Sequence, residues 1–155
     1  FINKEKNQTR HTVRLKFWAK LLQKMNEKSD LFKNISPSKD NWISCGSGHS
    51  GLGYVFVITG NFARIELWIN KGAKEENKQI FDKISSYKDQ IESKFGNELD
   101  WQRLDDGKGS RVAFYLNDVS VFNEEDWDKM IEFMTSNMIK FEKAMKDVLP
   151  GVLKK

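Results

Sequence analysis

Residues 52–70, LGYVFVITGNFARIELWIN, constrain the fold more than any other part of the chain. Gly60 and Asn61 tolerate the positive φ that the centre of a tight β-hairpin turn requires. Alternating apolar residues flank this turn, which predicts two antiparallel strands with Thr59 opposite Phe62. One face of the hairpin then carries only residues suited to a core: Leu52, Tyr54, Phe56, Ile58, Ala63, Ile65, Leu67 and Ile69. The other face is half-polar and could meet water, a partner or a ligand: Val55, Val57, Thr59, Phe62, Arg64, Glu66 and Trp68.

Three amphipathic helices are predicted around this hairpin. Apolar residues recur at helical spacing over about residues 9–28 and 74–95, and Gly96 follows the second stretch as a helix-ending residue. The third helix begins after the N-cap Asn123 and runs to about residue 149. Its apolar stripe is interpreted as core, and the alternative is a cofactor site or a groove for a partner. The stripe consists of Trp127, Met130, Met134, Met138, Phe141, Met145 and Val148.

Shorter strands are predicted at residues 42–44, 99–104 and 110–117. The order is therefore α-β-β-β-α-β-β-α, and the tight turns between strands imply an antiparallel sheet. We predict an α+β fold: a two-layer domain with a sheet of about five strands and three main helices. The 155 residues form a single predicted domain, in which residues 1–8 are flexible and residues 150–155 are a tail.

The composition indicates a cytoplasmic protein without membrane contact. One cysteine excludes an internal disulfide and suits a reducing compartment. No apolar run reaches the roughly 18 residues of a membrane span, and no short basic-then-apolar leader is present.

Basic side chains are concentrated in the first predicted helix. Residues 1–28 carry eight Lys or Arg against two Glu, whereas the rest of the chain carries 18 basic and 20 acidic residues. Lys16, Lys20, Lys24 and Lys28 follow one another at intervals of four, on the side opposite the apolar stripe. Such a row is either a solvated face or a surface that attracts polyanions.

The segment CGSGHSGLG, residues 45–53, contains the spacing G-x-G-x-x-G. A dinucleotide site needs a helix directly after these glycines, but a strand is predicted from Leu52. A kinase loop would have valine where Gly53 stands, and the G-K-[ST] of a Walker loop is missing. We interpret the segment as a turn.

No recognisable catalytic constellation is present, which favours a function other than catalysis. Cys45 and His49 supply too few ligands for a zinc site. They are also a weak candidate pair for nucleophilic catalysis. The strings Glu76-Asn77-Lys78 and Glu92-Ser93-Lys94 match the E-x-K of restriction-type nucleases, but both fall on a predicted helix. We predict no metal and no cofactor.

Aromatic residues and arginines alternate on the predicted strands and before the glycine turn. They can stack on bases and hold phosphates, or they can form a stacked Arg–Glu pair of the framework. The residues concerned are Trp42, Arg64, Glu66, Trp68, Trp101, Arg103 and Arg111.

Five segments resemble a known family: FWAKLLQ, WISCGSGHSGLGYVF, ARIELWIN, EENKQIFDKISSYKDQIESKFGNELDWQRLDDGKGSRV and EEDWDKMIEFMTSNMIKFEKAMK. They cover about residues 12–148, and the long central segment is the most specific. The chain is similar to the bacterial and archaeal family called domain of unknown function 4268. Several recurrent family positions are polar, which makes them candidates for a shared pocket. The chain retains Trp18, Trp42, Gly46, Gly51, Arg64, Glu66, Asn77, Phe81, Asp82, Lys88, Glu92, Phe95, Gly96, Trp101 and Arg111.

The resemblance implies an accessory role linked to DNA or to defence, because members often carry this domain behind a nuclease-like domain. We expect a non-catalytic, nucleic-acid-associated module that serves a nuclease in the same polypeptide or as a separate partner. The first helix would contact phosphates through Lys16, Lys20 and Lys24. A more specific surface would consist of Arg64, Trp68, Trp101 and Arg111.

Two other hypotheses remain at this point. The chain could be a protein-interaction or dimerisation module, including a homodimer, with no nucleic-acid contact. It could also be a small-ligand sensor or enzyme built around Arg64, Glu66, Asn77 and Glu92.

Overall fold

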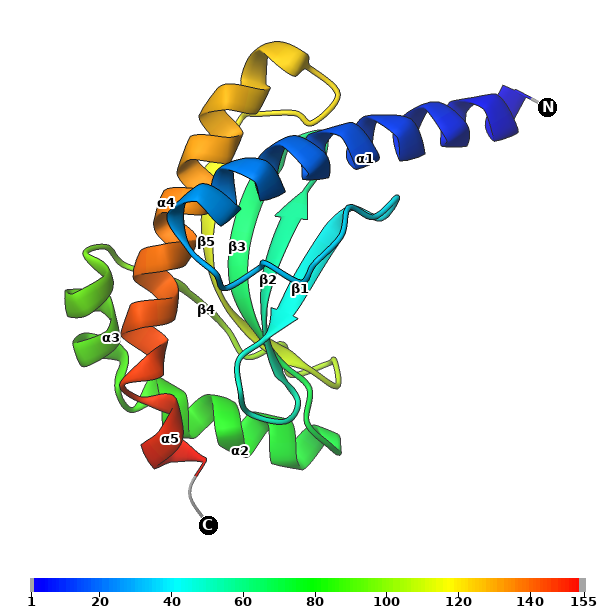
Figure 1. The fold of residues 1–155 in the computed structure, drawn as a ribbon. Helices are drawn as coiled ribbons and strands as arrows, with labels where there is room; N and C mark the ends of the chain where they lie inside the picture. Colours follow the sequence, from blue (N-terminus) through cyan, green and yellow to red (C-terminus); the bar gives the residue numbers. More distant parts are fainter. Residues whose placement is uncertain (1, 154–155) are drawn as a thin grey trace. The chain divides into compact units, whose positions relative to one another are not determined.

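The computed structural model describes the backbone of residues 2–153 and the side chains of residues 8–153. Its elements are α1 (Ile2–Lys28), β1 (Trp42–Gly46), β2 (Leu52–Ile58), β3 (Phe62–Ile69), α2 (Lys74–Ser85), α3 (Lys88–Phe95), β4 (Asp100–Gln102), β5 (Ser110–Asn117), α4 (Trp127–Lys146) and α5 (Leu149–Val152), with a 3-10 turn η1 (Glu124–Asp126) before α4. Figure 1 shows their arrangement. The α+β class and the predicted order of strands are confirmed.

The strands form one antiparallel five-stranded sheet in the order β1-β2-β3-β5-β4. Thr59 N–H donates to the carbonyl of Phe62 over 3.0 Å, so the hairpin turn places these residues opposite each other as predicted. Neither Gly60 nor Asn61 adopts the positive φ on which that prediction was based. Val57 consequently lies opposite Arg64. Ile58 N–H donates to the carbonyl of Asn41 over 2.9 Å. Trp42 therefore lies opposite Val57.

The predicted core positions are buried. All eight apolar residues on the core face of the hairpin, from Leu52 to Ile69, expose 3 % of their surface or less. The stripe of the last helix, from Trp127 to Val148, is buried as well, which confirms that it is core. In α1 the buried residues are Phe17, Trp18, Leu21, Leu22 and Met25.

The predicted helix over residues 74–95 is two helices. α2 ends at Ser85 and α3 begins at Lys88. The Ser86 hydroxyl donates to the carbonyl of Lys83 over 2.6 Å, and serine side chains compete in this way with the helical backbone ladder. Gly96 ends α3 with φ 97°, as predicted for a left-handed helix terminus.

The ends of the chain differ in detail from the prediction. α1 begins at Ile2 rather than near residue 9, and the short helix α5 occupies the start of the predicted tail. Residue 1 and residues 154–155, which belong to the two predicted terminal segments, lie outside the described residues. Among the described residues, no helix combines the length and the apolar character that a membrane span requires.

The chain divides into two compact units. Unit 1 comprises the described parts of residues 1–45, 56–64 and 115–136, and unit 2 comprises those of residues 46–55, 65–114 and 137–155.

In unit 1, α1 and the first half of α4 lie on one side of the strand segments (Figure 1). The side chains of Ile43, Phe56 and Ala63 point to that side and are buried. Side chains alternate along a strand, so Trp42, Val57 and Arg64 point to the other side. Among the described residues of unit 1, no helix covers that side. We call it the outward face.

Candidate functional site

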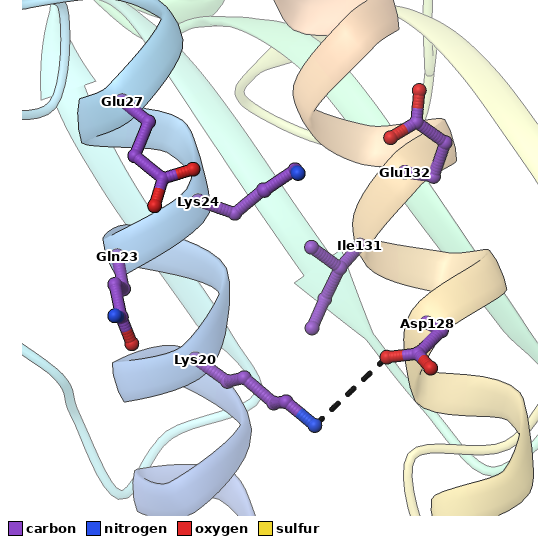
Figure 2. A pocket seen from close by; sticks show the side chains of 7 residues that line it. All are labelled: Lys20, Gln23, Lys24, Glu27, Asp128, Ile131 and Glu132. Carbon is purple, nitrogen blue, oxygen red and sulfur yellow. Dashed lines mark ion pairs between the residues drawn. The ribbon is translucent and has the colours of Figure 1, made fainter.

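The predicted lysine row of α1 lies beside carboxylates of α4. Lys20 Nζ is 3.9 Å from Asp128 Oδ1, and Lys28 Nζ is 3.3 Å from Glu132 Oε2. Figure 2 shows Lys20 and Lys24 extending from α1 toward α4. The positive charge of the row is therefore partly offset within unit 1. The positive charge of these lysines is therefore less available to phosphates than the sequence alone indicates.

Glu132 is held in its charged form by two neighbours. The Ser136 hydroxyl donates to Glu132 Oε1 over 2.8 Å, and Lys28 pairs with the other oxygen. The Ser136 hydrogen bond first, and then Lys28, keep the pKa of Glu132 below its ordinary value. The carboxylate that faces the lysine row is thus ionised at neutral pH.

A surface cleft of about 370 Å³ separates these parts of α1 and α4. Seven side chains line it, and Figure 2 draws them: Lys20, Gln23, Lys24, Glu27, Asp128, Ile131 and Glu132. Three carboxylates and two ammonium groups give this lining no excess of positive charge. The cleft is not suited to a polyanion such as a nucleic-acid backbone.

Lys16 lies farther along α1 and is exposed. It lines a second surface hollow together with Glu124 and Trp127. A carboxylate therefore accompanies this lysine too.

The outward face of unit 1 combines one arginine with three aromatic rings. Trp42 exposes 49 % of its surface at β1. Phe62, Arg64 and Tyr115 are half-buried on β3 and β5. The alternation of side chains along each strand, together with the Trp42–Val57 and Val57–Arg64 pairs, places Trp42 and Arg64 on one face.

Arg64 packs against two of these rings. Its guanidinium carbon is 5.4 Å from the centroid of the Phe62 ring and 5.4 Å from that of the Tyr115 ring. Its Nη1 donates to the Tyr115 hydroxyl oxygen over 3.2 Å. The two rings also meet edge to face, with centroids 5.3 Å apart. This packing fixes a positive charge in an aromatic surface without enclosing it.

In unit 2 a second arginine stacks on an aromatic ring. The Arg111 guanidinium carbon is 5.4 Å from the centroid of the Trp68 ring, and its Nη1 donates to Gln102 Oε1 over 3.0 Å. Its Nε is 3.6 Å from Glu66 Oε1, and Glu66 is only 4 % exposed. This group matches the framework interpretation of a stacked Arg–Glu pair.

Trp101 does not share a face with Arg111. The register pairs Trp101 with buried Val112, and Gln102 with Arg111. The Trp101 indole meets the Phe81 ring at a centroid distance of 6.3 Å. The predicted surface of Arg64, Trp68, Trp101 and Arg111 is therefore corrected, because Trp101 points to the other side of the sheet.

Glu92 accounts for the orientation of Trp101. Its Oε2 accepts hydrogen bonds from Trp101 Nε1 over 2.9 Å and from Leu99 N–H over 2.7 Å. One carboxylate thereby joins α3 to the start of β4. These bonds give Glu92 a structural role in the segment that follows Gly96.

Asn77 is fully buried and holds the loop after β3. Its Oδ1 accepts from the N–H groups of Lys71 and Gly72 over 2.7 and 3.1 Å. Its Nδ2 donates to the carbonyls of Gly72 and Lys108, each over 3.1 Å. Every polar atom of the Asn77 side chain thus serves the fold, and the hydrogen bonds of Asn77 and Glu92 are structural ones.

Lys78 is a buried residue that the sequence reasoning missed. It is 5 % exposed, and its Nζ donates to the carbonyls of Arg103, Leu104 and Gly109 over 2.6–2.7 Å. Its position three residues before the buried Phe81, on the same side of α2, was the available signal. Burial lowers the pKa of Lys78 from its ordinary value. This ammonium organises the turn between β4 and β5.

Arg103 lies at the surface of unit 2. Its Nε and Nη2 donate to the two oxygens of Asp82 over 2.9 and 3.1 Å, and its Nη1 pairs with Asp105. These hydrogen bonds raise the pKa of Arg103, and they lower the pKa of Asp82. Both acids neutralise the arginine, so it is a weak candidate for a phosphate contact.

The glycine-rich segment forms the turn between β1 and β2, as predicted, and β2 begins at Leu52. Gly51 has φ 79°, and a Cβ there would lie 2.2 Å from the Cα of Lys71. Only glycine fits this close approach. Within the described residues, no three His, Cys, Asp or Glu side chains gather as metal ligands would.

Comparison with known proteins supports the resemblance read from the sequence segments. Residues 13–149 match the family described as Domain of unknown function (DUF4268). The matched span runs from within α1 to the start of α5 and so includes every strand. No curated protein and no solved structure matches the chain. The family match covers most of the sequence, and the chain therefore belongs to the DUF4268 family.

Proposed function

We propose that this chain is a non-catalytic, nucleic-acid-associated module that binds single strands on the outward face of unit 1. The observation that carries the proposal is Arg64, whose guanidinium packs against the adjoining rings of Phe62 and Tyr115. Trp42 adds a ring with half of its surface exposed on the same face. Unpaired bases stack on such rings and on arginine planes, and phosphates are attracted to the guanidinium. A duplex hides its base faces, so the single-stranded form fits this surface.

The lysines of α1 have a secondary role in this proposal. α1 covers the side of the unit 1 strands opposite the outward face (Figure 1), and Asp128 and Glu132 offset part of its charge. Lys16, Lys20 and Lys24 each lie near a carboxylate, so they supply only a weak general attraction for phosphates. Each phosphate neutralised adds to the salt dependence of binding, so we expect a shallow slope that these lysines and Arg64 share.

We further propose that the module serves a nuclease or a defence-type system, in one polypeptide or as a partner. The support is the family resemblance, because members often carry the domain behind a nuclease-like domain. Deleting the domain from such a member should weaken the affinity of the nuclease for its nucleic acid. The metal-dependent cleavage step of that nuclease should remain intact.

Fluorescence anisotropy with labelled single-stranded DNA, single-stranded RNA and duplex DNA of equal length tests the leading proposal. We expect at least one single strand to bind about tenfold more tightly than the duplex, since stacking contributes about 1–3 kcal/mol per base. Binding should weaken as salt is raised. A chain that binds none of the three at low salt would contradict the proposal, and so would a preference for the duplex.

A further inference from the structure

β1 is an edge strand of the sheet, with β2 as its neighbour. Two hydrogen bonds define how they pair: Ile58 N–H donates to the carbonyl of Asn41 over 2.9 Å, and Ser47 N–H donates to that of Leu52 over 3.2 Å. In an antiparallel pair, alternate residues direct both backbone groups toward the neighbouring strand. Along this strand the inward-bonding positions are therefore 41, 43, 45 and 47.

The residues between them direct their N–H and C=O groups away from β2. These residues are Trp42, Ser44 and Gly46, and together they present three donors and three acceptors along the outer edge. Within residues 2–153, no turn or loop makes a backbone hydrogen bond to any of the three. Trp42 and Gly46 are exposed and Ser44 is half-buried.

Two of the features that usually prevent strand pairing, charge and proline, are missing from this edge. Soluble proteins protect exposed edges with charged residues, proline, bulges or a covering segment. β1 reads WISCG and contains neither a charge nor a proline. An exposed, uncharged edge of this kind is a template for an added strand.

We propose that two copies of this chain pair antiparallel through β1, about a twofold axis at Ser44. In this register Ser44 faces Ser44 of the second copy, and Trp42 faces Gly46 of the second copy. Gly46 has no side chain, and even an added Cβ there would meet nothing within 4 Å in its own chain. The space beside it therefore accommodates the exposed indole of Trp42.

The sequence of β1 favours a second copy over an unrelated strand. Its largest residue and its smallest stand at opposite ends, so antiparallel copies are complementary to each other. Centring the pair on Ser44 uses all three outward residues of each copy, which gives six backbone hydrogen bonds. A shift of two residues in either direction places Trp42 or Gly46 beyond the partner strand and loses bonds.

This pairing rests on β1 and does not require nucleic acid. Residues opposite each other in an antiparallel pair share a face, so the outward faces of the two copies become continuous. Two Trp42 side chains then lie on one surface. If the proposed function holds as well, the dimer offers a longer track to a single strand than one copy does.

Sedimentation velocity over a hundredfold range of concentration tests the pairing. We expect the wild type to form a dimer, and Ser44→Pro to weaken dimerisation by about tenfold or more, because proline removes the central outward donor. Within the described chain that donor makes no backbone hydrogen bond to a turn or loop, so the fold should be retained, which circular dichroism checks. Ser44→Ala keeps the N–H and should dimerise like the wild type.

Two further variants keep the test decisive if Ser44→Pro disturbs the strand. Gly46→Phe fills the space that Trp42 of the second copy needs and should also weaken the dimer. Ser44→Cys in a Cys45→Ala background should cross-link between copies with a short bifunctional thiol reagent, because opposite Cα atoms in such a pair are about 5.5 Å apart.

A wild type that stays monomeric at every concentration would overturn the pairing. A dimer that Ser44→Pro and Gly46→Phe leave unchanged would overturn it too. A dimer in which the Ser44→Cys variant forms no intermolecular cross-link would overturn the register. A monomer that still binds single strands would overturn the pairing and leave the proposed function standing.

Discussion

Arg64 donates a hydrogen bond to the hydroxyl of Tyr115 over 3.2 Å, and its guanidinium carbon lies 5.4 Å from the centroid of the same ring. One residue belongs to β3 and the other to β5, which are neighbours in the sheet. Arg64 is thereby held in one orientation before any ligand arrives. Such preorganisation lowers the entropy that binding must overcome.

Removing the hydroxyl tests this contact. Tyr115→Phe keeps the ring and loses the acceptor, so the free energy of unfolding should fall by about 1 kcal/mol. Urea denaturation followed by circular dichroism measures the change. Tyr87→Phe is the matched control, because Tyr87 is 43 % exposed. An equal loss in the two variants would show that the Arg64–Tyr115 bond contributes nothing.

Lys78→Met should destabilise unit 2. The variant keeps the length of the side chain but leaves buried carbonyls of Arg103, Leu104 and Gly109 without their donor. We expect a loss of about 3 kcal/mol in the free energy of unfolding. Amide hydrogen exchange over residues 103–110 should accelerate. Lys83→Met, at an exposed position of the same helix, should neither lower the free energy of unfolding nor accelerate hydrogen exchange. Comparable effects from both variants would refute the role of Lys78.

Gly51→Ala should be poorly tolerated, whereas Gly46→Ala should be harmless. The added methyl group at Gly51 meets the backbone of Lys71 at 2.2 Å, and the φ of 79° is strained for alanine. The two effects together should cost about 3 kcal/mol. At Gly46 the same methyl group meets nothing within 4 Å. Thermal unfolding of the two variants measures the difference, and equal melting temperatures would contradict the close approach.

Acid should weaken the contribution of Asp82 to stability. The hydrogen bonds from Arg103 lower the pKa of Asp82 in the folded chain, whereas an aspartate in an unfolded chain has a pKa of about 3.9. A lowered pKa stabilises the fold above the unfolded value, and this stabilisation disappears as pH falls through the folded value. Both side chains are about half exposed, so solvent screening limits the contribution to under about 1 kcal/mol.

Asp82→Asn measures that contribution. The variant should be less stable than the wild type at neutral pH, and the difference should shrink in acid. Asp100→Asn, at an exposed position of β4, is the control for the loss of a surface charge. A difference between Asp82→Asn and the wild type that does not depend on pH would contradict the assignment.

Much of the fold could be predicted because its signals are local. Gly60-Asn61 marks the turn of the hairpin, Asn123 caps the 3-10 turn that leads into the last helix, and Gly96 ends another helix. Each signal depends on the conformation of one or two residues, and a single sequence carries that information. The helix break at Ser86 was missed because the apolar spacing continues on both sides of it.

The candidate site was predicted less completely because its contacts join distant segments. The acidic neighbours of Lys20 and Lys28 come from α4, in a part of the sequence far from α1. The face of Trp101 depends on the register of β4 against β5 across the intervening turn. In the sequence Lys78 is indistinguishable from a surface lysine, because the loop carbonyls that accept its hydrogen bonds come from residues 103–109.

The most direct measurement is the affinity of the double variant Trp42→Ala/Arg64→Gln for single-stranded DNA and RNA, compared with that of the wild type. A lysine control, Lys16→Ala/Lys20→Ala/Lys24→Ala, accounts for the general attraction of α1. We predict that the double variant loses about tenfold or more in affinity, because it removes a stacking ring and a fixed charge, whereas the lysine control loses less. A double variant that binds as tightly as the wild type would contradict the assignment of the outward face.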